Sequence, residues 1–257
     1  MEYLQGRYRI TKIRPGCMCD FTVECPEIAA ISKAGQFVHI RVPGFTLRRP
    51  ISICEVDKQQ GTLRILFDVR GEGTKILAQA KEGDLLDVMG PLGNGFELLD
   101  SGKKAVVVGG GIGVPPMLET AKQYRENATA ILGFRSEDKI VLTEDFKAQK
   151  NRVMLCTDDG SAGHHGLVTD LLRERFAEEK PDIVYACGPK VMLKFVAKMC
   201  EEYGVRCQVS LEERMACGVG ACLGCATPIK KEDGSVTYLH VCKDGPVFEA
   251  ERVVFDD

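Results

Sequence analysis

The 257-residue sequence lacks an excess of either charge, a signal peptide and a long uninterrupted hydrophobic run. Its 34 basic and 37 acidic residues give a net charge of −3, which provides no electrostatic basis for binding nucleic acid or an anionic membrane. The first residues, Met1–Arg7, lack the basic and apolar regions of a signal peptide. The longest apolar stretch, Ala105–Leu118, contains four glycines and two prolines and is too short for a membrane-spanning helix. We therefore expect a cytoplasmic protein with no membrane or nucleic-acid partner.

Internal repeats and low-complexity segments are also missing, whereas cysteine is abundant, with twelve residues. Without an export signal, so many cysteines are typical of the reducing cytoplasm, where a framework of disulfides would not persist. Four of them form the motif described below. We interpret Cys54, Cys156, Cys200 and Cys207 as small buried hydrophobic residues.

Residues 1–100 contain short apolar or alternating runs that are separated by turn residues. The expected strands are Tyr8–Ile13, Phe21–Cys25, Phe37–Val42, Ile51–Val56, Leu63–Val69 and Leu85–Met89. Six strands without long helices between them predict an antiparallel β-barrel.

Strands alternate with helices from residue 101 to residue 210. The expected strands are Ala105–Val108, Thr129–Phe134, Arg152–Thr157, Ile183–Cys187 and Arg206–Ser210, and the expected helices are Met117–Arg125, Glu144–Gln149, Leu167–Phe176 and Val191–Tyr203. This alternation predicts an α/β domain with a parallel sheet. Residues 211–257, with a hairpin expected around Glu232–Ser235, are too few for a hydrophobic core of their own, so we expect a metal centre to stabilise them.

Four cysteines of this last segment have the spacing of an iron–sulfur site. Cys217, Cys222, Cys225 and Cys242 follow the C-x4-C-x2-C…C pattern of plant-type [2Fe–2S] ligation. The small or apolar residues between the first three allow a loop to wrap closely around a cluster. A structural zinc ion is the alternative, but zinc sites usually pair their cysteines in two separated C-x2–4-C units, whereas here the fourth cysteine stands alone after 16 residues. We therefore favour a [2Fe–2S] cluster.

The glycine-rich segment Gly109–Pro116 follows an expected strand and opens an expected helix. In this position the backbone amides around Gly111 and Gly113, together with the helix dipole, can bind a pyrophosphate. A proline replaces the third glycine of the dinucleotide-binding fingerprint, so the segment alone could equally be a tight connection. A second turn containing Cys187 and Gly188 ends a later strand at the carboxyl edge of the sheet, which favours an NAD site.

Asp158 and Asp159 follow the third strand of the same domain. A carboxylate beside the adenosine accepts hydrogen bonds from ribose hydroxyls but repels a 2′-phosphate, so this pair favours NAD over NADP. The alternative is that both aspartates only cap a turn. We interpret the neighbouring His164 and His165 as surface residues, because nothing near them in the sequence would make either a catalytic base.

The segment Arg49–Ser52 combines a guanidinium and a hydroxyl at the start of an expected strand. Arginine can bind a diphosphate in a bidentate manner, and a serine on an extended segment can reach the edge of a planar ring. Arg70–Lys75 form a second amide-rich turn, which precedes a helix and suits a phosphate. Considered alone, an Arg-Pro-x-Ser segment is more often an ordinary strand edge at the surface.

Together these motifs resemble the electron-transfer subunits of dihydroorotate dehydrogenase B, within the ferredoxin-reductase-like superfamily. The resemblance covers nearly the whole chain and is carried by Arg49–Ser52, Gly73–Thr74, Gly90–Gly93, Gly109–Pro116, Cys187–Pro189 and Leu211–Cys222. The last segment is the most specific, because stand-alone ferredoxin reductases lack a cluster of their own. The resemblance implies an FAD-binding barrel at residues 1–100, an NAD-binding domain at 101–210 and a [2Fe–2S] domain at 211–257. It also implies a separate FMN-containing catalytic subunit that oxidises dihydroorotate in pyrimidine biosynthesis, in a heterotetramer with two copies of each subunit.

The resemblance also implies which residues contact each cofactor. The flavin segment is Arg49, Pro50, Ile51 and Ser52, the ring-and-ribose strand is Leu66, Phe67 and Asp68, the phosphate turn is Gly73 and Thr74, and the cluster ligands are Cys217, Cys222, Cys225 and Cys242. We expect Ser52 to hydrogen-bond near flavin N5 and Cys187 to lie beside the nicotinamide. Two departures from the superfamily are that Ile51 replaces a tyrosine and that the cluster segment replaces a C-terminal aromatic residue.

The chemistry of the cofactors sets the expected order of transfer. Nicotinamide exchanges hydride, an iron–sulfur centre exchanges single electrons, and a flavin can do both. We expect electrons from the partner's FMN to enter at the [2Fe–2S] cluster, pass to FAD and leave as hydride to NAD+. Two alternatives stay open: a reductase subunit that serves ferredoxin, sulfite reductase or hydrogenase, and a zinc-stabilised regulatory module that senses nucleotides without turnover.

Overall fold

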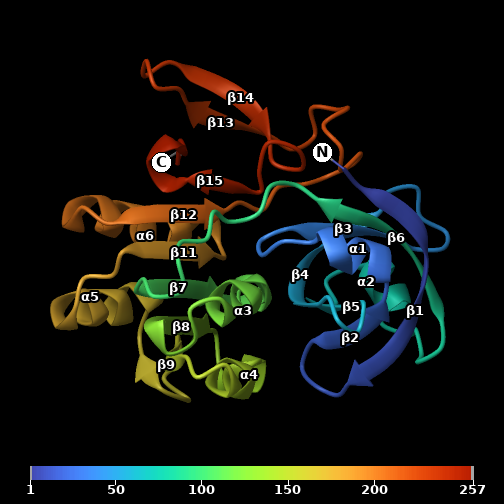
Figure 1. Cartoon of the computed structure of the whole chain (residues 1–257), viewed down its shortest axis with the longest axis horizontal. Helices are drawn as coiled ribbons and strands as arrows, with labels where there is room; N and C mark the ends of the chain where they lie inside the picture. Colours follow the sequence, from blue (N-terminus) through green and yellow to red (C-terminus); the bar gives the residue numbers. More distant parts are fainter. Residues whose placement is uncertain (1, 256–257) are drawn as a thin grey trace.

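The computed structural model describes residues 2–255 and contains a β-barrel, a layered α/β region and a cysteine-rich segment that adjoins both (Figure 1). The barrel is closed and antiparallel, with strand order β1-β2-β5-β4-β3-β6. Its strands are β1 (Leu4–Arg14), β2 (Cys19–Glu24), β3 (Phe37–Arg41), β4 (Arg49–Asp57), β5 (Thr62–Phe67) and β6 (Leu85–Leu92), with the short helices α1 (Pro26–Ile31) and α2 (Glu72–Leu77). The predicted six-stranded barrel is confirmed.

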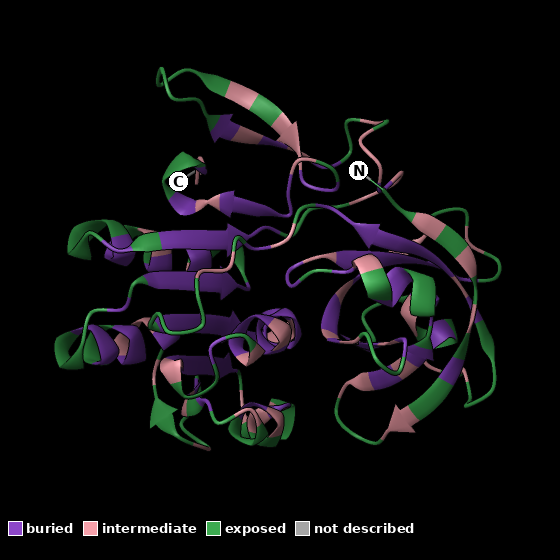
Figure 2. Ribbon diagram, viewed as in Figure 1, coloured by how far each residue is buried: buried purple, intermediate pink, exposed green. Residues whose placement is uncertain are grey.

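The interior of the barrel is filled by the apolar side chains of alternate strand residues. Ile10, Ile40 and Ile65 are almost fully buried there, and the rings of Phe21 and Phe67 meet edge to face at 5.2 Å. Figure 2 shows buried residues over most of the inner strands and exposed residues at the outer turns. The barrel is thus a packed core, and its outer wall is free to form one side of a site.

The α/β region is built on a seven-stranded sheet in the order β10-β9-β8-β7-β11-β12-β15. The strands are β7 (Ala105–Gly110), β8 (Ala128–Phe134), β9 (Arg152–Thr157), β10 (His164–His165), β11 (Ile183–Cys187), β12 (Arg206–Ser210) and β15 (Val247–Glu249). The helices are α3 (Pro115–Lys122), α4 (Thr143–Ala148), α5 (Val168–Glu178) and α6 (Lys190–Tyr203). All neighbouring strands are parallel except β15, which runs antiparallel to β12.

The central strand β7 shows why helices cover both faces of the sheet. Val106 and Val108 belong to the apolar cluster that contains residues of α5 and α6. Ala105 and Val107 point the other way, into the cluster that contains residues of α3 and α4. A strand that is apolar on both faces requires two covering layers, as expected for a parallel sheet.

The barrel and the sheet are held together by ion pairs and a backbone hydrogen bond. The buried Arg64 of β5 pairs with Asp20 of β2 at 2.7 Å and also with Asp145 of α4. Glu119 of α3 accepts a hydrogen bond of 3.0 Å from the backbone N–H of Val56 in β4. Breaking such buried contacts would leave uncompensated charge, so they fix the relative position of the two regions and the shape of the cleft between them.

The segment after residue 210 is attached to the sheet as well as to the barrel. Strands β13 (Ala226–Lys230) and β14 (Val236–His240) form the hairpin that was predicted around Glu232–Ser235. The chain then returns to add β15 to the sheet, an addition that no sequence pattern predicted. The domain limits at residues 100 and 210 stay a prediction. Within residues 2–255, none of the helices is long and apolar enough to cross a membrane.

Candidate functional site

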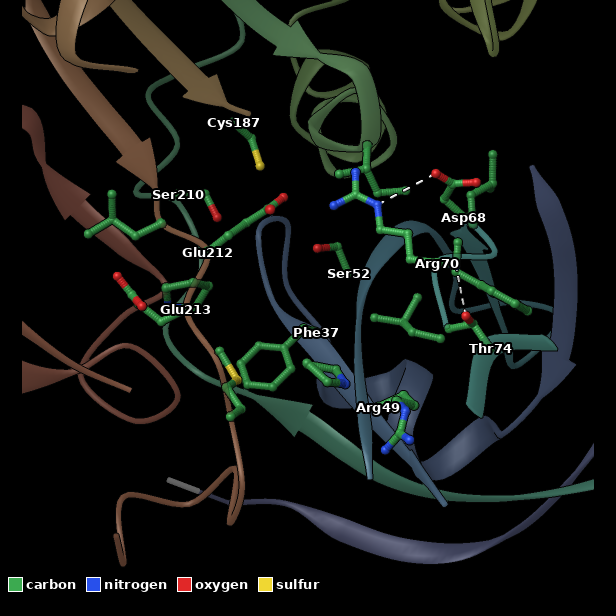
Figure 3. A pocket seen from close by; sticks show the side chains of 18 residues that line it. Phe37, Arg49, Ser52, Asp68, Arg70, Thr74, Cys187, Ser210, Glu212 and Glu213 are labelled. Carbon is green, nitrogen blue, oxygen red and sulfur yellow. Dashed lines mark hydrogen bonds and ion pairs between the residues drawn. The ribbon is translucent and has the colours of Figure 1, made fainter. Parts of the chain in front are cut away.

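A cleft between the barrel and the sheet brings together most of the residues that were predicted to bind a flavin (Figure 3). The barrel contributes Phe37, Arg49, Pro50, Ile51, Ser52, Leu66, Phe67, Asp68, Arg70 and Thr74. The sheet and the segment that follows it contribute Ile112, Cys187, Ser210, Leu211, Glu212, Glu213, Met215 and Pro246. Segments that are far apart in the sequence therefore form one apolar cleft with a few polar groups, as is typical of cofactor sites.

Arg49 lies next to the first turn of α2. Its guanidinium stands 4.7 Å from the ring centre of Phe45, and Nη1 donates a hydrogen bond to the carbonyl oxygen of Leu47 at 2.5 Å. A Cβ atom on Gly73 would lie only 2.4 Å from Nη2 of Arg49, so glycine is what allows the guanidinium to approach this turn. A cation beside backbone amides forms an environment suited to a diphosphate.

Thr74 shapes the turn that precedes α2. Its Oγ1 atom accepts hydrogen bonds from the backbone N–H groups of Arg70 at 3.0 Å and Gly71 at 3.1 Å, and donates one to the carbonyl oxygen of Gly71 at 2.9 Å. The hydroxyl is thus engaged within the turn, and its contribution to a phosphate site is to hold the backbone in place.

The opposite part of the cleft carries the two residues that were predicted to act beside the flavin and the nicotinamide. Ser52 comes from β4 and Cys187 from the end of β11, and both line the cleft (Figure 3). Burial raises the pKa of the Cys187 thiol to about 12; the charge of Glu212 adds to this rise and the hydroxyl of Ser210 opposes it. The thiol is therefore protonated at neutral pH and is unsuited to act as a nucleophile.

Ser210 and Glu212 line the cleft, although no motif in the sequence predicts a site role for either residue. Glu212 is exposed to solvent, but the atoms that surround it still desolvate the carboxyl group and raise its pKa, and the charge of Arg70 opposes the rise. The signal that could have identified both residues is their position at the carboxyl end of a parallel strand, β12, where ligands of open α/β sheets bind.

A second pocket lies at the carboxyl edge of the sheet, on the side of α5 and α6. Its lining consists of Gly110, Gly111, Gly133, Phe134, Arg135, Cys156, Asp158, Leu167, Val168, Thr169, Pro189, Val191, Met192 and Phe195. The turn between β7 and α3 passes this pocket as a short 3-10 helix, η1 (Gly111–Gly113), which begins with a φ of +54° at Gly111. This left-handed conformation favours glycine.

Two glycines keep the turns after β7 and β11 in contact. A Cβ atom on Gly113 would lie 2.2 Å from the carbonyl oxygen of Cys187. Gly188 has a φ of +155°, and a Cβ atom there would lie 2.7 Å from Cε of Met192 and 3.1 Å from the backbone nitrogen of Gly110. The predicted residues Gly111, Gly113 and Gly188 therefore meet at one edge of the sheet.

The two aspartates that were predicted to select NAD have different surroundings. Asp158 lines the second pocket. The carboxylate of Asp159 instead accepts hydrogen bonds from the hydroxyl of Ser161 at 2.6 Å and from its backbone N–H at 2.9 Å, and these bonds lower the pKa of Asp159. The structure thus brings only Asp158 into the pocket, whereas Asp159 caps a turn. His164 and His165 are exposed on β10.

The four cysteines of the predicted cluster site lie in two pairs. The sulfur atoms of Cys217 and Cys222 are 3.5 Å apart. Cys225 and Cys242 are both buried, and the backbone N–H of Cys242 donates to Sγ of Cys225 at 3.5 Å. Within the described part of the chain, no three histidine, cysteine, aspartate or glutamate side chains are arranged to hold a single metal ion. The contacts at the sulfur atoms group Cys217 with Cys222 and Cys225 with Cys242.

Backbone amides of the cysteine loop point at these sulfur atoms. The N–H groups of Val219 and Ala221 donate to Sγ of Cys217 at 3.4 and 3.2 Å, and the N–H of Gly220 donates to Sγ of Cys242 at 3.2 Å. Burial opposes ionisation of Cys217, but the hydrogen bonds of the loop lower its pKa to about 6. Burial and the neighbouring Cys225 raise the pKa of Cys242 to about 12. Amides that stabilise thiolates are a property of metal-binding loops.

The cysteine loop adjoins the wall of the flavin cleft. Cys217, Cys225 and Cys242 pack in the same apolar cluster as Phe37 and Met89 of the barrel. Phe37 also lines the cleft. Met215, two residues before Cys217, lines the cleft as well, so the segment that leads into the cysteine loop borders the candidate flavin site.

A closed barrel, a parallel sheet and the cleft between them define the chain as a ferredoxin-reductase-like oxidoreductase. Its sequence matches the family descriptions "Oxidoreductase NAD-binding domain" at residues 107–198 and "Iron-sulfur cluster binding domain of dihydroorotate dehydrogenase B" at residues 212–254. The chain belongs to the family of electron transfer subunits of dihydroorotate dehydrogenase B (NAD(+)).

Curated relatives carry this assignment over most of the chain. The electron transfer subunit of Caldanaerobacter subterraneus subsp. tengcongensis is 48% identical over 86% of this chain and 87% of its own length. The subunit of Streptococcus mutans is 44% identical over 90% of each chain. The predicted resemblance and the predicted fold class are therefore confirmed.

Solved structures support the same architecture. A chain of the NADH-dependent reduced ferredoxin-NADP oxidoreductase superposes with a TM-score of 0.85 at 33% identity, and the match covers 97% of this chain and 90% of that one. The ferredoxin reductase in carbazole 1,9a-dioxygenase superposes with a TM-score of 0.68 at 20% identity, over 80% of this chain and 67% of that one. The second likeness shows the fold alone.

Proposed function

We propose that this chain transfers electrons between NAD and an FMN-containing subunit that oxidises dihydroorotate, with FAD in the cleft and a [2Fe–2S] cluster in the cysteine loop. The observation that carries the proposal is that the segment leading into the cysteine loop lines the cleft, since Met215, which borders the cleft, lies two residues before Cys217. When bound, a flavin exchanges hydride with nicotinamide and single electrons with an iron–sulfur centre, which is the conversion such a subunit must perform.

The residues of the cleft fit FAD. Arg49 and the turn held by Thr74 provide a cation and ordered amides for the diphosphate, and Gly73 leaves room for both. Pro50, Ile51, Leu66 and Phe67 supply apolar walls for a planar ring. Ile51 stands where a stacking aromatic residue is common in the superfamily, so this side chain would offer the ring aliphatic contact instead of stacking.

The paired cysteines fit a binuclear cluster better than a zinc ion. A structural zinc requires four ligands around one point, whereas a [2Fe–2S] cluster needs two thiolates for each of two irons. The pairs Cys217–Cys222 and Cys225–Cys242 and the amides directed at Cys217 and Cys242 match the second requirement.

The second pocket fits NAD. The turn at Gly111 and Gly113 is suited to the pyrophosphate. The Asp158 carboxylate would accept a hydrogen bond from a free ribose 2′-hydroxyl and would repel a 2′-phosphate. Asp159 is occupied by its turn, so selection of NAD would depend on Asp158 alone.

Ser52 and Cys187 are proposed to act where flavin and nicotinamide meet. The hydroxyl of Ser52 would donate a hydrogen bond near flavin N5, and the neutral thiol of Cys187 would pack beside the nicotinamide. We expect Ser52→Ala to slow the reduction of bound flavin by NADH, measured by stopped-flow absorption, while the exposed control Ser101→Ala keeps the original rate. Equal rates in both variants would exclude this assignment for Ser52.

The partner is proposed to be a dihydroorotate dehydrogenase subunit with FMN, in a complex with two copies of each chain. The word "subunit" in the names of the relatives supports a partner, and we infer the stoichiometry from the family resemblance. Twelve free cysteines support a reducing compartment such as the cytoplasm.

The likeness to a ferredoxin-NADP oxidoreductase favours transfer to ferredoxin as the second candidate function. The two candidates are separated by assaying the chain with an FMN-containing dihydroorotate dehydrogenase subunit and, in parallel, with ferredoxin. We expect dihydroorotate-dependent reduction of NAD+ only when the FMN subunit is present. We expect Cys222→Ser to abolish this reaction while retaining FAD and NADH oxidation by a small dye, and the exposed Cys17→Ser to change neither. Activity with ferredoxin and no complex with the FMN subunit would contradict the proposal.

A further inference from the structure

His39 of β3 is a fully buried histidine whose ring has no hydrogen-bond partner. Its exposed fraction is 0%, and neither Nδ1 nor Nε2 has a partner among the described residues. The backbone carbonyl of His39 accepts a hydrogen bond from Nη1 of Arg48 at 3.2 Å. The atoms of His39 that lack a hydrogen-bond partner are therefore the two ring nitrogens. Buried polar groups without partners are rare and destabilising, which makes a bound group the natural source of the missing contact.

The ring of His39 lies against the cysteine loop. A Cβ atom on Gly218 would lie 2.5 Å from Nδ1 and 2.9 Å from Cε1, so the Nδ1 edge of the ring contacts the residue that directly follows Cys217. Gly218 is itself buried and has a φ of +74°. Any larger residue at this position would therefore push the histidine and the loop apart.

Two further neighbours of His39 are apolar. The ring of Phe37 meets it edge-on at 6.0 Å, and Met89 lies opposite His39 in the register of β3 and β6. Residues two apart on a strand share a face, so Phe37 and His39 form one side of β3. Along this side, Phe37 reaches the flavin cleft and His39 reaches the cysteine loop.

Given the cluster of the proposed function, on which this inference rests, we propose that Nδ1–H of His39 donates a hydrogen bond to a sulfur atom of the iron–sulfur centre. The loop amides of Val219, Gly220 and Ala221 point at cysteine sulfurs from within the segment, and His39 adds a donor from the barrel. Donors to sulfur stabilise the more negative, reduced state of a cluster and raise its reduction potential. His39 thereby sets how readily the cluster accepts an electron.

The test compares three substitutions in the complete complex by redox titration monitored by electron paramagnetic resonance. His39→Phe keeps a ring and removes both nitrogens, His39→Asn retains a donor near the position of Nδ1, and His39→Gln retains one near the position of Nε2. The control Met89→Leu alters the residue opposite His39 in the register of β3 and β6 without changing a polar group. Iron and flavin contents are measured for every variant.

We expect His39→Phe to disfavour one-electron reduction of the cluster about tenfold, a decrease of ~59 mV in its potential. We expect His39→Asn and Met89→Leu to stay near the original potential and His39→Gln to follow His39→Phe. An unchanged potential in iron-loaded His39→Phe would overturn the proposal, as would a change confined to FAD. If His39→Phe does not fold, equal potentials in His39→Asn and His39→Gln would overturn it. Absence of iron from the unsubstituted chain would instead overturn the proposed function.

Discussion

Substitution of Gly113 by alanine tests whether the two glycine turns at the edge of the sheet must touch. The added Cβ would lie 2.2 Å from the carbonyl oxygen of Cys187, 2.4 Å from its carbonyl carbon and 2.6 Å from the nitrogen of Gly188. All three are backbone atoms, so no side-chain rotation can relieve the contact. Ordinary van der Waals contact requires the two turns to separate by about 1 Å.

The expected cost follows from overpacking a buried site, which destabilises a protein by about 1–3 kcal/mol. For a chain of this size, each kcal/mol lowers the melting temperature by about 2–4 °C, so we expect a decrease of about 2–12 °C. The same separation would displace the two turns that are proposed to hold NAD. A loss of about 1.4 kcal/mol in binding would weaken the affinity for NADH about tenfold.

The assay combines thermal unfolding, followed by circular dichroism, with titration of NADH into the FAD-loaded protein. Gly102→Ala is the matched control, because this exposed glycine has no atom within 4 Å of an added Cβ and the change should stay within about 0.5 kcal/mol. FAD content should be the same in both variants, since the residues proposed to hold the FAD diphosphate, Arg49 and the turn at Thr74, belong to the barrel. A Gly113→Ala protein that matches the control in melting temperature and NADH affinity would refute the reasoning.

Three further predictions concern the flavin turn, the choice of nucleotide and a titrating carboxyl group. Gly73→Ala should displace the Arg49 guanidinium and lower FAD retention in equilibrium dialysis at least about tenfold. The control Gly71→Ala should retain FAD, because a Cβ atom at Gly71 meets no atom within 4 Å. Equal retention in the two variants would contradict a diphosphate at this turn. Asp158→Ser should remove the repulsion of a 2′-phosphate and increase kcat/KM for NADPH relative to NADH, and an unchanged ratio would exclude Asp158 from selection. The raised pKa of Glu212 means that ionisation of its carboxyl group opposes folding. Glu212→Gln removes this cost, so the gain in free energy of unfolding, measured with urea, should be absent below pH 4.5 and increase as the pH rises above it. A gain that does not depend on pH would contradict the raised pKa.

The sequence was sufficient to predict the elements and the chemistry that depend on local patterns. Alternating apolar runs such as Phe37–Val42 predicted the barrel, and the regular succession of strands and helices after residue 101 predicted the sheet. The spacing of Cys217, Cys222 and Cys225 is also local, and it predicted a site whose thiols do lie in pairs.

The features that escaped prediction depend on contacts between distant segments. Strand β15 is only three residues long and forms because β12 offers an unpaired edge, which no local pattern indicates. Asp158 and Asp159 are adjacent and chemically identical, and only the position of Ser161 in the folded turn distinguishes them. The contact between His39 and Gly218 joins strand β3 to a loop near the other end of the chain.

The most direct test of the account is iron analysis combined with electron paramagnetic resonance of the anaerobically purified complex. We predict two irons and two inorganic sulfides for each copy of this chain, together with the signal of a reduced [2Fe–2S] cluster after addition of dihydroorotate or NADH. The same sample should contain one FAD for each copy. A complex that contains zinc in place of iron, or iron that neither dihydroorotate nor NADH can reduce, would contradict the central claim.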